Sequence, residues 1–494
     1  MFTTNVDPLE RSAPEHQGTD SSALLQFVEE LERQIQEVHS FMLLRHGRVV
    51  AEGWWSPYKP EYPHALFSVS KSVTSTAVGL AVMEGRFSIE DPVLSFFPEE
   101  KPPEVSDFLA AMSVRHLLTM STGHAAETLS YLIDHPDGNW IKGFFHAPIL
   151  HAPGTYFAYN TGATYMLSAI VQKTTGLRLI DYLRPRLFEP LGIKKGTWQE
   201  SPQGIALGGY GLSMTTEDVV RFGLLYLQKG RWDDHQIVPE AWVEASTSLQ
   251  ISNGDLSLPH DSVQGYGYQF WRCRYNAYRA SGVFGQYCIV MPEQDAVLAI
   301  TGGMDVFEDQ KLLDFVWKFL VPAMRPESIP ENGTTQETLT RKLSNLSLPP
   351  VQGISTSAVS SQISGQTYAV DANELQIETI ALDFVGSVCS MKFKTPGGEE
   401  TISCGYDSWY EGHTTLFSNT PWLPDGSVPV VASGAWTTKD SFTTVVRLYE
   451  TPFFYTLVFY FLDAEMLVEI QVNVSLDSIK PILLTAHRWE SEAR

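Results

Sequence analysis

The feature that most constrains the fold is a predicted helix that is apolar on almost every side. In the 494-residue chain, the stretch ALFSVSKSVTSTAVGLAVMEG predicts a helix over residues 68–84. Val73 and Leu80 mark one face, and Val78 continues the apolar surface beyond it. A helix of this kind must be surrounded by other elements, and Gly85 stands where a helix commonly ends. The chain therefore needs a domain large enough to enclose this helix.

The start of the same helix carries a polar motif. Ser68 and Lys71 form S-x-x-K, and residues three apart lie on one face of a helix. The helix dipole disfavours a protonated lysine at this end, and burial lowers a lysine pKa. Both effects favour a neutral amine that accepts a proton from Ser68 Oγ, so Ser68 is a candidate nucleophile with Lys71 as its base. The alternative is two polar residues that simply begin a buried helix, because such a motif arises by chance about once or twice in a chain of this length.

A second motif offers a partner for the lysine, since a buried unpaired charge is costly. In GTYFAYNTGATYMLSAIVQKTTG, Tyr159 stands just before a predicted helix, beside Asn160 and Thr161. A tyrosinate, or a proton shared between Tyr159 and Lys71, would supply a second base.

Composition limits the partners. The formal net charge of −23 argues against nucleic acid and anionic membranes, because both would be repelled. No stretch reaches the roughly 20 apolar residues of a membrane span. The polar N-terminus does not resemble a secretory signal, so we expect a cytoplasmic location. The four cysteines are widely spaced, which disfavours a zinc site and favours reduced structural thiols.

The pattern of the chain predicts an α+β protein with two folded domains. We expect a polar tail over 1–20, a domain over 21–325, a linker over 326–362 rich in Ser, Thr and Pro, and a second domain over 363–494. In the first domain, FMLLRHGRVVAEGWW predicts a hairpin with a turn at His46 and Gly47, and GYGYQFW, GQYCIVMP and AVLAITGG predict later strands. Strands and helices at both ends of this domain thus bracket a helical middle. In the second, period-2 strands with turn signals predict an antiparallel β domain, a sandwich or a barrel.

Several motifs occur in an order that resembles the serine β-lactamase-like superfamily. They are FSVSKSVTS, SVRHLLTMSTGH, YNTG, GGYGLSMTTEDVVRFG and ASGVFGQYCIVMPEQDAVLAI, and they cover about residues 25–325. The chain looks most like class C β-lactamases, family VIII carboxylesterases and D-aminopeptidases. The resemblance implies a transpeptidase-like domain, with an antiparallel sheet flanked by helices and a helical subdomain, and it suggests a lipocalin-like barrel for the C-terminal domain.

The resemblance also implies roles for individual residues. Ser68 would form an acyl-enzyme, with Lys71 and Tyr159 as bases, and the backbone N–H groups of Ser68 and Val283 would form the oxyanion hole. The positions that would contact substrate are Thr161, Ser281, Gly282, His124 and Tyr210. No cofactor and no metal is implied, because these side chains supply the nucleophile and the bases.

Two departures from the family pattern bear on the substrate. The K-T-G triplet appears as Ala280, Ser281 and Gly282, so its lysine is missing, although Arg279 is adjacent. The asparagine of Y-x-N is replaced by Thr161. Both changes favour an esterase or a small-amide hydrolase over a β-lactamase or a cell-wall peptidase.

We therefore predict a serine hydrolase that acts on a small-molecule ester, amide or peptide. The alternatives are β-lactamase activity, acyl transfer from the same acyl-enzyme to an alcohol or amine, and a catalytically inactive scaffold. The absence of a G-x-S-x-G elbow disfavours an α/β-hydrolase. The oligomeric state does not follow from the sequence.

Overall fold

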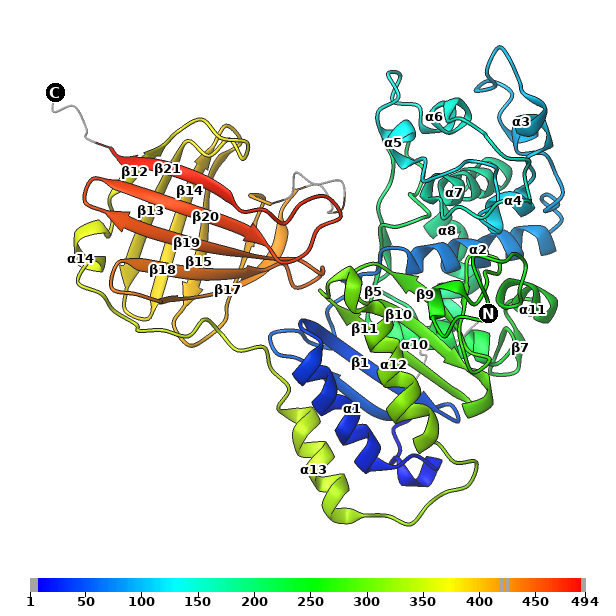
Figure 1. The fold of residues 1–494 in the computed structure, drawn as a ribbon, viewed down its shortest axis with the longest axis horizontal. Coiled ribbons are helices and arrows are strands. Elements are labelled where there is room, and N and C mark those ends of the chain that lie inside the picture. Colours follow the sequence, from blue (N-terminus) through cyan, green and yellow to red (C-terminus); the bar gives the residue numbers. More distant parts are fainter. Residues whose placement is uncertain (1–7, 418–421, 423–425, 490–494) are drawn as a thin grey trace. The chain divides into compact units, whose positions relative to one another are not determined.

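The computed structural model describes residues 8–417, 422 and 426–489, and these form two compact units (Figure 1). The first unit contains the chain up to Trp54 and Pro60–Asn345. The second contains Trp55–Lys59 and the chain from Leu346 onward. The α+β class and the two kinds of domain predicted from the sequence are confirmed.

An antiparallel six-stranded sheet forms the framework of the first unit. Its strand order is β2-β1-β11-β10-β9-β8. The strands are β1 (Val38–Arg45), β2 (Arg48–Trp54), β8 (Trp271–Arg272), β9 (Tyr278–Gly282), β10 (Gln286–Met291) and β11 (Ala296–Gly302). The predicted hairpin turn at His46 and Gly47 is present, with φ values of 48° and 73°. Because β1 pairs with β11, the two ends of the domain meet in the middle of the sheet.

The predicted apolar helix is α2 (Val69–Met83), and it lies at the centre of the domain. Its residues from Val69 to Ala81 are buried. It packs against β9, α7 (Thr161–Thr175) and α8 (Leu179–Leu183), while α10 (Thr216–Leu227) packs on the central strands of the sheet. The almost continuous apolar surface of α2 thus finds neighbours on several sides, as a helix of this type requires.

Shorter elements complete the helical part of the first unit. The helices are α3 (Asp107–Ala111), α4 (Val114–Leu118), α5 (Leu129–Ile133), α6 (Trp140–His146), α9 (Glu189–Leu191) and α11 (Glu240–Thr247). The small strands are β3 (His64–Ala65), β4 (Thr197–Trp198), β5 (Leu212–Met214), β6 (Arg231–Trp232) and β7 (His235–Gln236). None of the helices in the described ranges combines the length and the apolar character that crossing a bilayer demands.

Two segments outside the predicted domain core pack onto it. Within the predicted tail, Ser12 N donates to Val49 O at 2.9 Å, so this segment follows β2. Within the predicted linker, α13 (Gly333–Ser344) packs against α1 (Ser21–Gln34), where Lys342 pairs with Glu32. Helix α13 buries the apolar side chain of Leu339, whereas the tail buries the polar residues Glu15 and Thr19. The small number of buried apolar side chains explains why the composition of these segments indicated a tail and a linker.

One predicted strand is mostly absent. The run GYGYQFW alternates aromatic residues, but only its last residue belongs to a strand, β8. Tyr266, Tyr268 and Phe270 are all buried, and Gln269 between them has a φ of 66°. The alternation of aromatic residues therefore reflects their burial in an irregular segment and not the hydrogen-bond pairing of a β-strand.

The second unit is an antiparallel barrel. Its strands are β12 (Thr367–Val370), β13 (Thr379–Val385), β14 (Val388–Thr395), β15 (Gly398–Gly405), β16 (Tyr410–Thr414), β17 (Val428–Trp436), β18 (Ser441–Arg447), β19 (Phe454–Leu462), β20 (Glu465–Val472) and β21 (Ile482–Arg488). The parallel pairing of Gly405 with Ser433 joins β15 to β17 and closes the ring, and β16 pairs with residues 428–432 of β17. Alternate residues such as Met391, Phe459 and Val468 fill the interior.

Candidate active site

The candidate nucleophile stands at the N-terminus of α2. Ser68 is the N-cap residue and is half-buried. The residue before it, Phe67, has a φ of 49°, a left-handed conformation that is unfavourable for a bulky side chain. Two contacts hold this turn: Ser70 Oγ donates to Phe67 O at 2.5 Å, and the Phe67 ring meets Phe284 edge-on at 5.6 Å. Strained backbone of this kind is concentrated at functional sites.

Lys71 lies one turn further along α2 and is buried. Its Nζ donates to Ser68 Oγ at 3.0 Å, to Thr161 Oγ1 at 3.2 Å and to Gly209 O at 2.9 Å. Burial lowers the pKa of Lys71 from 10.5 to about 8, and the negative charge of Glu127 opposes this shift. The amine can therefore lose its proton near neutral pH while its three contacts aim it at Ser68 Oγ.

Tyr159 approaches Ser68 from the segment before α7. Asn160 is the N-cap of that helix, and its Oδ1 accepts from Ala163 N at 3.2 Å. Burial raises the pKa of Tyr159 well above its usual value, and a hydrogen bond with Ser68 acts in the opposite direction. Lys71 Nζ lies 4.8 Å from the centroid of the Tyr159 ring, over its face. The structure thus brings Ser68, Lys71, Tyr159 and Thr161 together.

Gly209 supplies the third acceptor for Lys71 and has no room for a side chain. A Cβ atom on Gly209 would lie 2.6 Å from Thr161 Cγ2 and 3.4 Å from Lys71 Nζ. Gly208 is similarly confined, and its carbonyl accepts from Thr74 Oγ1 at 2.8 Å. The GG pair before Tyr210 therefore lets the backbone approach α2 closely.

The end of β9 lies against the backbone of the candidate nucleophile. A Cβ atom on Gly282 would be 2.3 Å from Leu66 O and 3.1 Å from Ser68 N. In the described part of the chain, no hydrogen-bond acceptor is found for the backbone N–H of Ser68 or of Val283. Ser281 and Val283 are both half-buried beside this edge. Within the described residues, both N–H groups are therefore without an acceptor, and Gly282, the neighbour of Val283, lies against Ser68 N.

The position of the missing family lysine carries no charge. It is occupied by Ala280, which is only 1% exposed. The neighbouring Arg279 is also buried, and its Nη1 donates to Asp261 O and to Cys273 Sγ, both at 3.0 Å. Its guanidinium carbon lies 5.5 Å from the Trp271 ring. Trp271 on β8 is paired directly with Arg279 on β9. Arg279 is therefore held inside the protein by Asp261 and Cys273.

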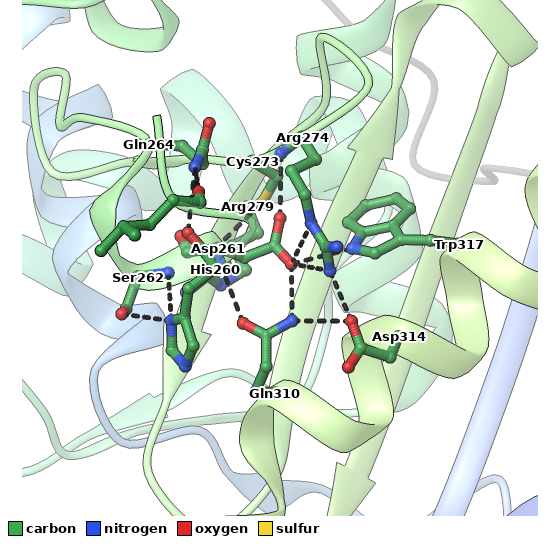
Figure 2. A network of polar contacts seen from close by, with 11 residues as sticks. His260, Asp261, Ser262, Gln264, Cys273, Arg274, Arg279, Gln310, Asp314 and Trp317 are labelled. Carbon is green, nitrogen blue, oxygen red and sulfur yellow. Dashed lines mark hydrogen bonds and ion pairs between the residues drawn. The ribbon is translucent and has the colours of Figure 1, made fainter. Parts of the chain in front are cut away.

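Figure 2 shows the network that fixes this arginine and the loop around it. The Asp261 carboxylate is fully buried and accepts from Arg274 Nη2 at 2.8 Å, from Gln310 Nε2 at 2.9 Å and from Trp317 Nε1 at 2.9 Å. Burial alone would raise the pKa of Asp261, but the hydrogen bonds from Arg274 and Gln310 hold it below its usual value. The network ties the loop before β8 to α12 (Asp309–Phe315) and to the helical segment Val316–Leu320 that follows it.

Aromatic side chains form one wall beside Tyr159. The Trp271 ring lies 5.3 Å from the Tyr159 ring, and Tyr266 meets Tyr159 edge-on at 6.3 Å. Phe157 contacts both Tyr266 and Trp271. These aromatic neighbours account for the burial that raises the pKa of Tyr159.

The model of the Beta-lactamase family matches residues 28–307. The chain belongs to the beta-lactamase family. A 6-aminohexanoate-dimer hydrolase of Paenarthrobacter ureafaciens is 26% identical over 60% of this chain and 81% of its own length. Esterase EstB of Burkholderia gladioli is 25% identical over 31% of this chain and 45% of its own length. The relatives of this family member are thus hydrolases, and the superfamily resemblance drawn from the motifs is confirmed.

The fold likeness reaches beyond the region that the family model matches. A solved structure of SurE with D-Leu covers 95% of this chain and 99% of that chain, with a TM-score of 0.50 and 16% identity. At this identity the likeness concerns the fold alone. It agrees with a beta-lactamase-family domain followed by a β domain.

Two of the predicted substrate-contacting residues are enclosed. His124 is buried, with Nδ1 2.8 Å from Thr122 Oγ1 and its ring edge-on to Phe144. Burial lowers the pKa of His124 to about 4, so it is neutral at ordinary pH. Tyr210 is 5% exposed, and burial raises its pKa. Their contacts with a substrate stay predictions.

The sequence did not predict that Glu127 belongs to the site. The Glu127 carboxylate accepts hydrogen bonds from the backbone of Thr161 and lies close enough to act on the pKa of Lys71, Tyr159 and Tyr210. The signal is weak, because Glu127 is an exposed acidic residue in a loop, like many others in the chain. Across the described ranges, no group of three or more His, Cys, Asp or Glu side chains is arranged to hold a metal.

Proposed function

We propose that this chain is a serine hydrolase that acts through an acyl-enzyme on a small ester, amide or peptide. The observation that carries the proposal is the 3.0 Å contact between Lys71 Nζ and Ser68 Oγ, because the lysine pKa of about 8 makes the amine an available base. Membership of a family whose relatives are hydrolases supports the same activity.

The geometry suggests how each step proceeds. Ser68 Oγ attacks the acyl carbon as its proton passes to Lys71 Nζ. The N–H groups of Ser68 and Val283 stabilise the oxyanion, an interaction worth about 3–4 kcal/mol per donor in other hydrolases. The neutral Tyr159 hydroxyl donates its proton to the leaving group and regains one from Lys71, which is then neutral again. Lys71 takes a proton from the water that attacks the acyl-enzyme, and a proton returns to Ser68 Oγ as the acid leaves.

The substrate preference follows from the missing positive charge at the end of β9. Ala280 leaves no cation at the position of the family lysine, and Arg279 is bonded to Asp261 O and Cys273. A substrate carboxylate therefore has no buried cation to meet at this edge. The aromatic wall formed by Phe157, Tyr266 and Trp271 favours an acyl or leaving group with apolar surface. An ester or a small neutral amide fits these features better than a β-lactam.

The test is intact-mass spectrometry combined with turnover assays. The probes are a short p-nitrophenyl ester, a linear 6-aminohexanoate dimer, a D-amino-acid amide and nitrocefin. An acyl adduct or turnover that disappears in Ser68→Ala identifies the nucleophile, and the reactive probe names the substrate class. Ser75→Ala is the matched control, because Ser75 lies on the same helix and is buried away from these contacts. Turnover that persists in Ser68→Ala would reject the proposal.

Two further parts of the proposal concern partners and location. Adding alcohols or amines to the ester assay measures acyl transfer, which uses the same acyl-enzyme. A small-molecule substrate, the lack of a nucleic-acid partner and a cytoplasmic location stay predictions from the sequence.

A further inference from the structure

The N-terminus of α7 is held by a carboxylate from a separate segment. Glu127 Oε1 and Oε2 each lie 2.8 Å from Thr161 N, and Oε1 also accepts from Gly162 N at 3.3 Å. The same Oε1 accepts from Thr128 N at 2.8 Å, in the segment that leads into α5. A carboxylate at this end of a helix interacts favourably with the unpaired N–H groups and with the helix dipole.

A second contact fastens the same two segments. Thr128 Oγ1 donates to Asn160 Oδ1 at 2.7 Å, and a Cβ atom on Gly162 would lie only 2.2 Å from Thr128 Oγ1. Residues 127–128 therefore clamp the turn that carries Tyr159 and Thr161. The clamp is connected to the candidate active site, because Thr161 Oγ1 is one of the three acceptors of Lys71 Nζ.

Glu127 is also the charge that acts on this lysine. The titratable groups that share its surroundings are Tyr159 before α7, Tyr210 before β5 and His124 in the loop of Glu127 itself. Burial raises the pKa of both tyrosines and lowers that of His124 to about 4, so all three are neutral near pH 8. Arg279 also acts on Tyr159 and lowers its pKa. Glu127 opposes the effect of burial on Lys71.

We propose that Glu127 is a positioning residue, which holds Thr161 against Lys71 and places a negative charge beside the Lys71 ammonium. This inference rests on the proposed function, in which Lys71 is the base. Without the charge, the protonated amine loses stabilisation and Lys71 gives up its proton at a lower pH. Without the hydrogen bonds, Thr161 no longer fixes the direction of the amine.

The main experiment compares Glu127→Gln and Glu127→Asp with the unchanged chain. For a p-nitrophenyl ester, the rise of kcat/KM with pH should move to lower pH in Glu127→Gln, by roughly half a unit to one unit. The plateau should fall by about 3-fold to 30-fold, because the base is less well aligned. Glu127→Asp retains the charge and should restore most of the pH profile.

A control separates this role from simple capping. Asp20→Asn removes an exposed acid that caps another helix, α1, where Asp20 Oδ1 accepts from Ser22 N at 2.8 Å. It should leave the pH profile unchanged. A Glu127→Gln profile that keeps its midpoint while the melting temperature falls would show that Glu127 only stabilises the helix, and would overturn the proposal.

A second measurement keeps the inference testable if no probe is turned over. Lys71 can be followed by NMR with labelled lysine, its signal assigned by its loss in Lys71→Met. The Lys71 pKa should be lower in Glu127→Gln than in the unchanged chain. A clear fall without any esterase turnover would support the role of Glu127 and count against the proposed function. An unchanged Lys71 pKa would reject the role of Glu127, whatever the activity.

Discussion

Lys71 Nζ lies over the face of the Tyr159 ring, 4.8 Å from its centroid, and donates to Ser68 Oγ at 3.0 Å. A cation in this position is attracted by the electrons of the ring, so the contact favours the ammonium while leaving the tyrosine hydroxyl free to meet Ser68. The two candidate bases therefore reach Ser68 separately. Since burial lowers the pKa of Lys71 to about 8 and raises that of Tyr159, Lys71 loses its proton first.

This order of titration predicts the pH dependence of the free enzyme. A protonated Lys71 cannot accept the Ser68 proton, so kcat/KM for an ester should rise with pH around a midpoint near 8 and level off above it. The profile should be measured over about pH 6–10, and Ser75→Ala should reproduce it. A profile that is flat across this range would show that Lys71 is not the base.

The neutral phenol of Tyr159 predicts a separate effect on the chemical step. Tyr159→Phe retains the ring that packs against Trp271 but removes the hydroxyl. We expect kcat to fall by about 100-fold or more with little change in KM, because a proton donor for the leaving group is lost. Tyr156→Phe is the control, since Tyr156 is exposed and stacks on His151. An unchanged kcat in Tyr159→Phe would assign proton donation to another group.

The sequence predicted the part of the site that short-range patterns encode. Ser68 and Lys71 are three residues apart on a helix, so their common face followed from helix geometry. Tyr159 was suggested because a buried lysine needs a polar partner, and the family resemblance then supplied its role and that of Thr161. The strands β1, β2, β10 and β11 were predicted from their alternation and apolar runs.

Contacts between distant segments were not predictable in the same way. Glu127 meets Thr161 across 34 positions, and the carbonyl of Gly209 meets Lys71 across 138. Neither contact leaves a local pattern, since any loop acid or loop carbonyl looks alike in the sequence. The side-chain direction of Arg279 also depends on the register of β9 with β8, which pairs Arg279 with Trp271.

The close approach of Gly209 predicts that even one methyl group disturbs the site. In Gly209→Ala, the new Cβ would lie 2.6 Å from Thr161 Cγ2, so either Thr161 or the carbonyl bonded to Lys71 must move. We expect kcat/KM to fall by about 10-fold to 100-fold. Gly196→Ala is the matched control, because its Cβ would meet atoms at 3.6 Å or beyond. Equal activity in the two variants would show that the Lys71 contact with Gly209 O is dispensable.

The buried Asp261 network predicts a loss of stability with a defined pH dependence. Asp261→Asn leaves Arg274 and the loop before β8 without their carboxylate, and we expect the free energy of unfolding to fall by about 3–5 kcal/mol near pH 7. The native pKa of Asp261 lies below its usual value, so its contribution is fully present above about pH 4 and is lost as the pH falls further. The difference between the unchanged chain and the variant should therefore shrink in acid. Denaturant unfolding at several pH values measures it, with Asp255→Asn, an exposed acid of the same loop, as control. A loss no larger than that of Asp255→Asn would show that the network in Figure 2 contributes little to the fold.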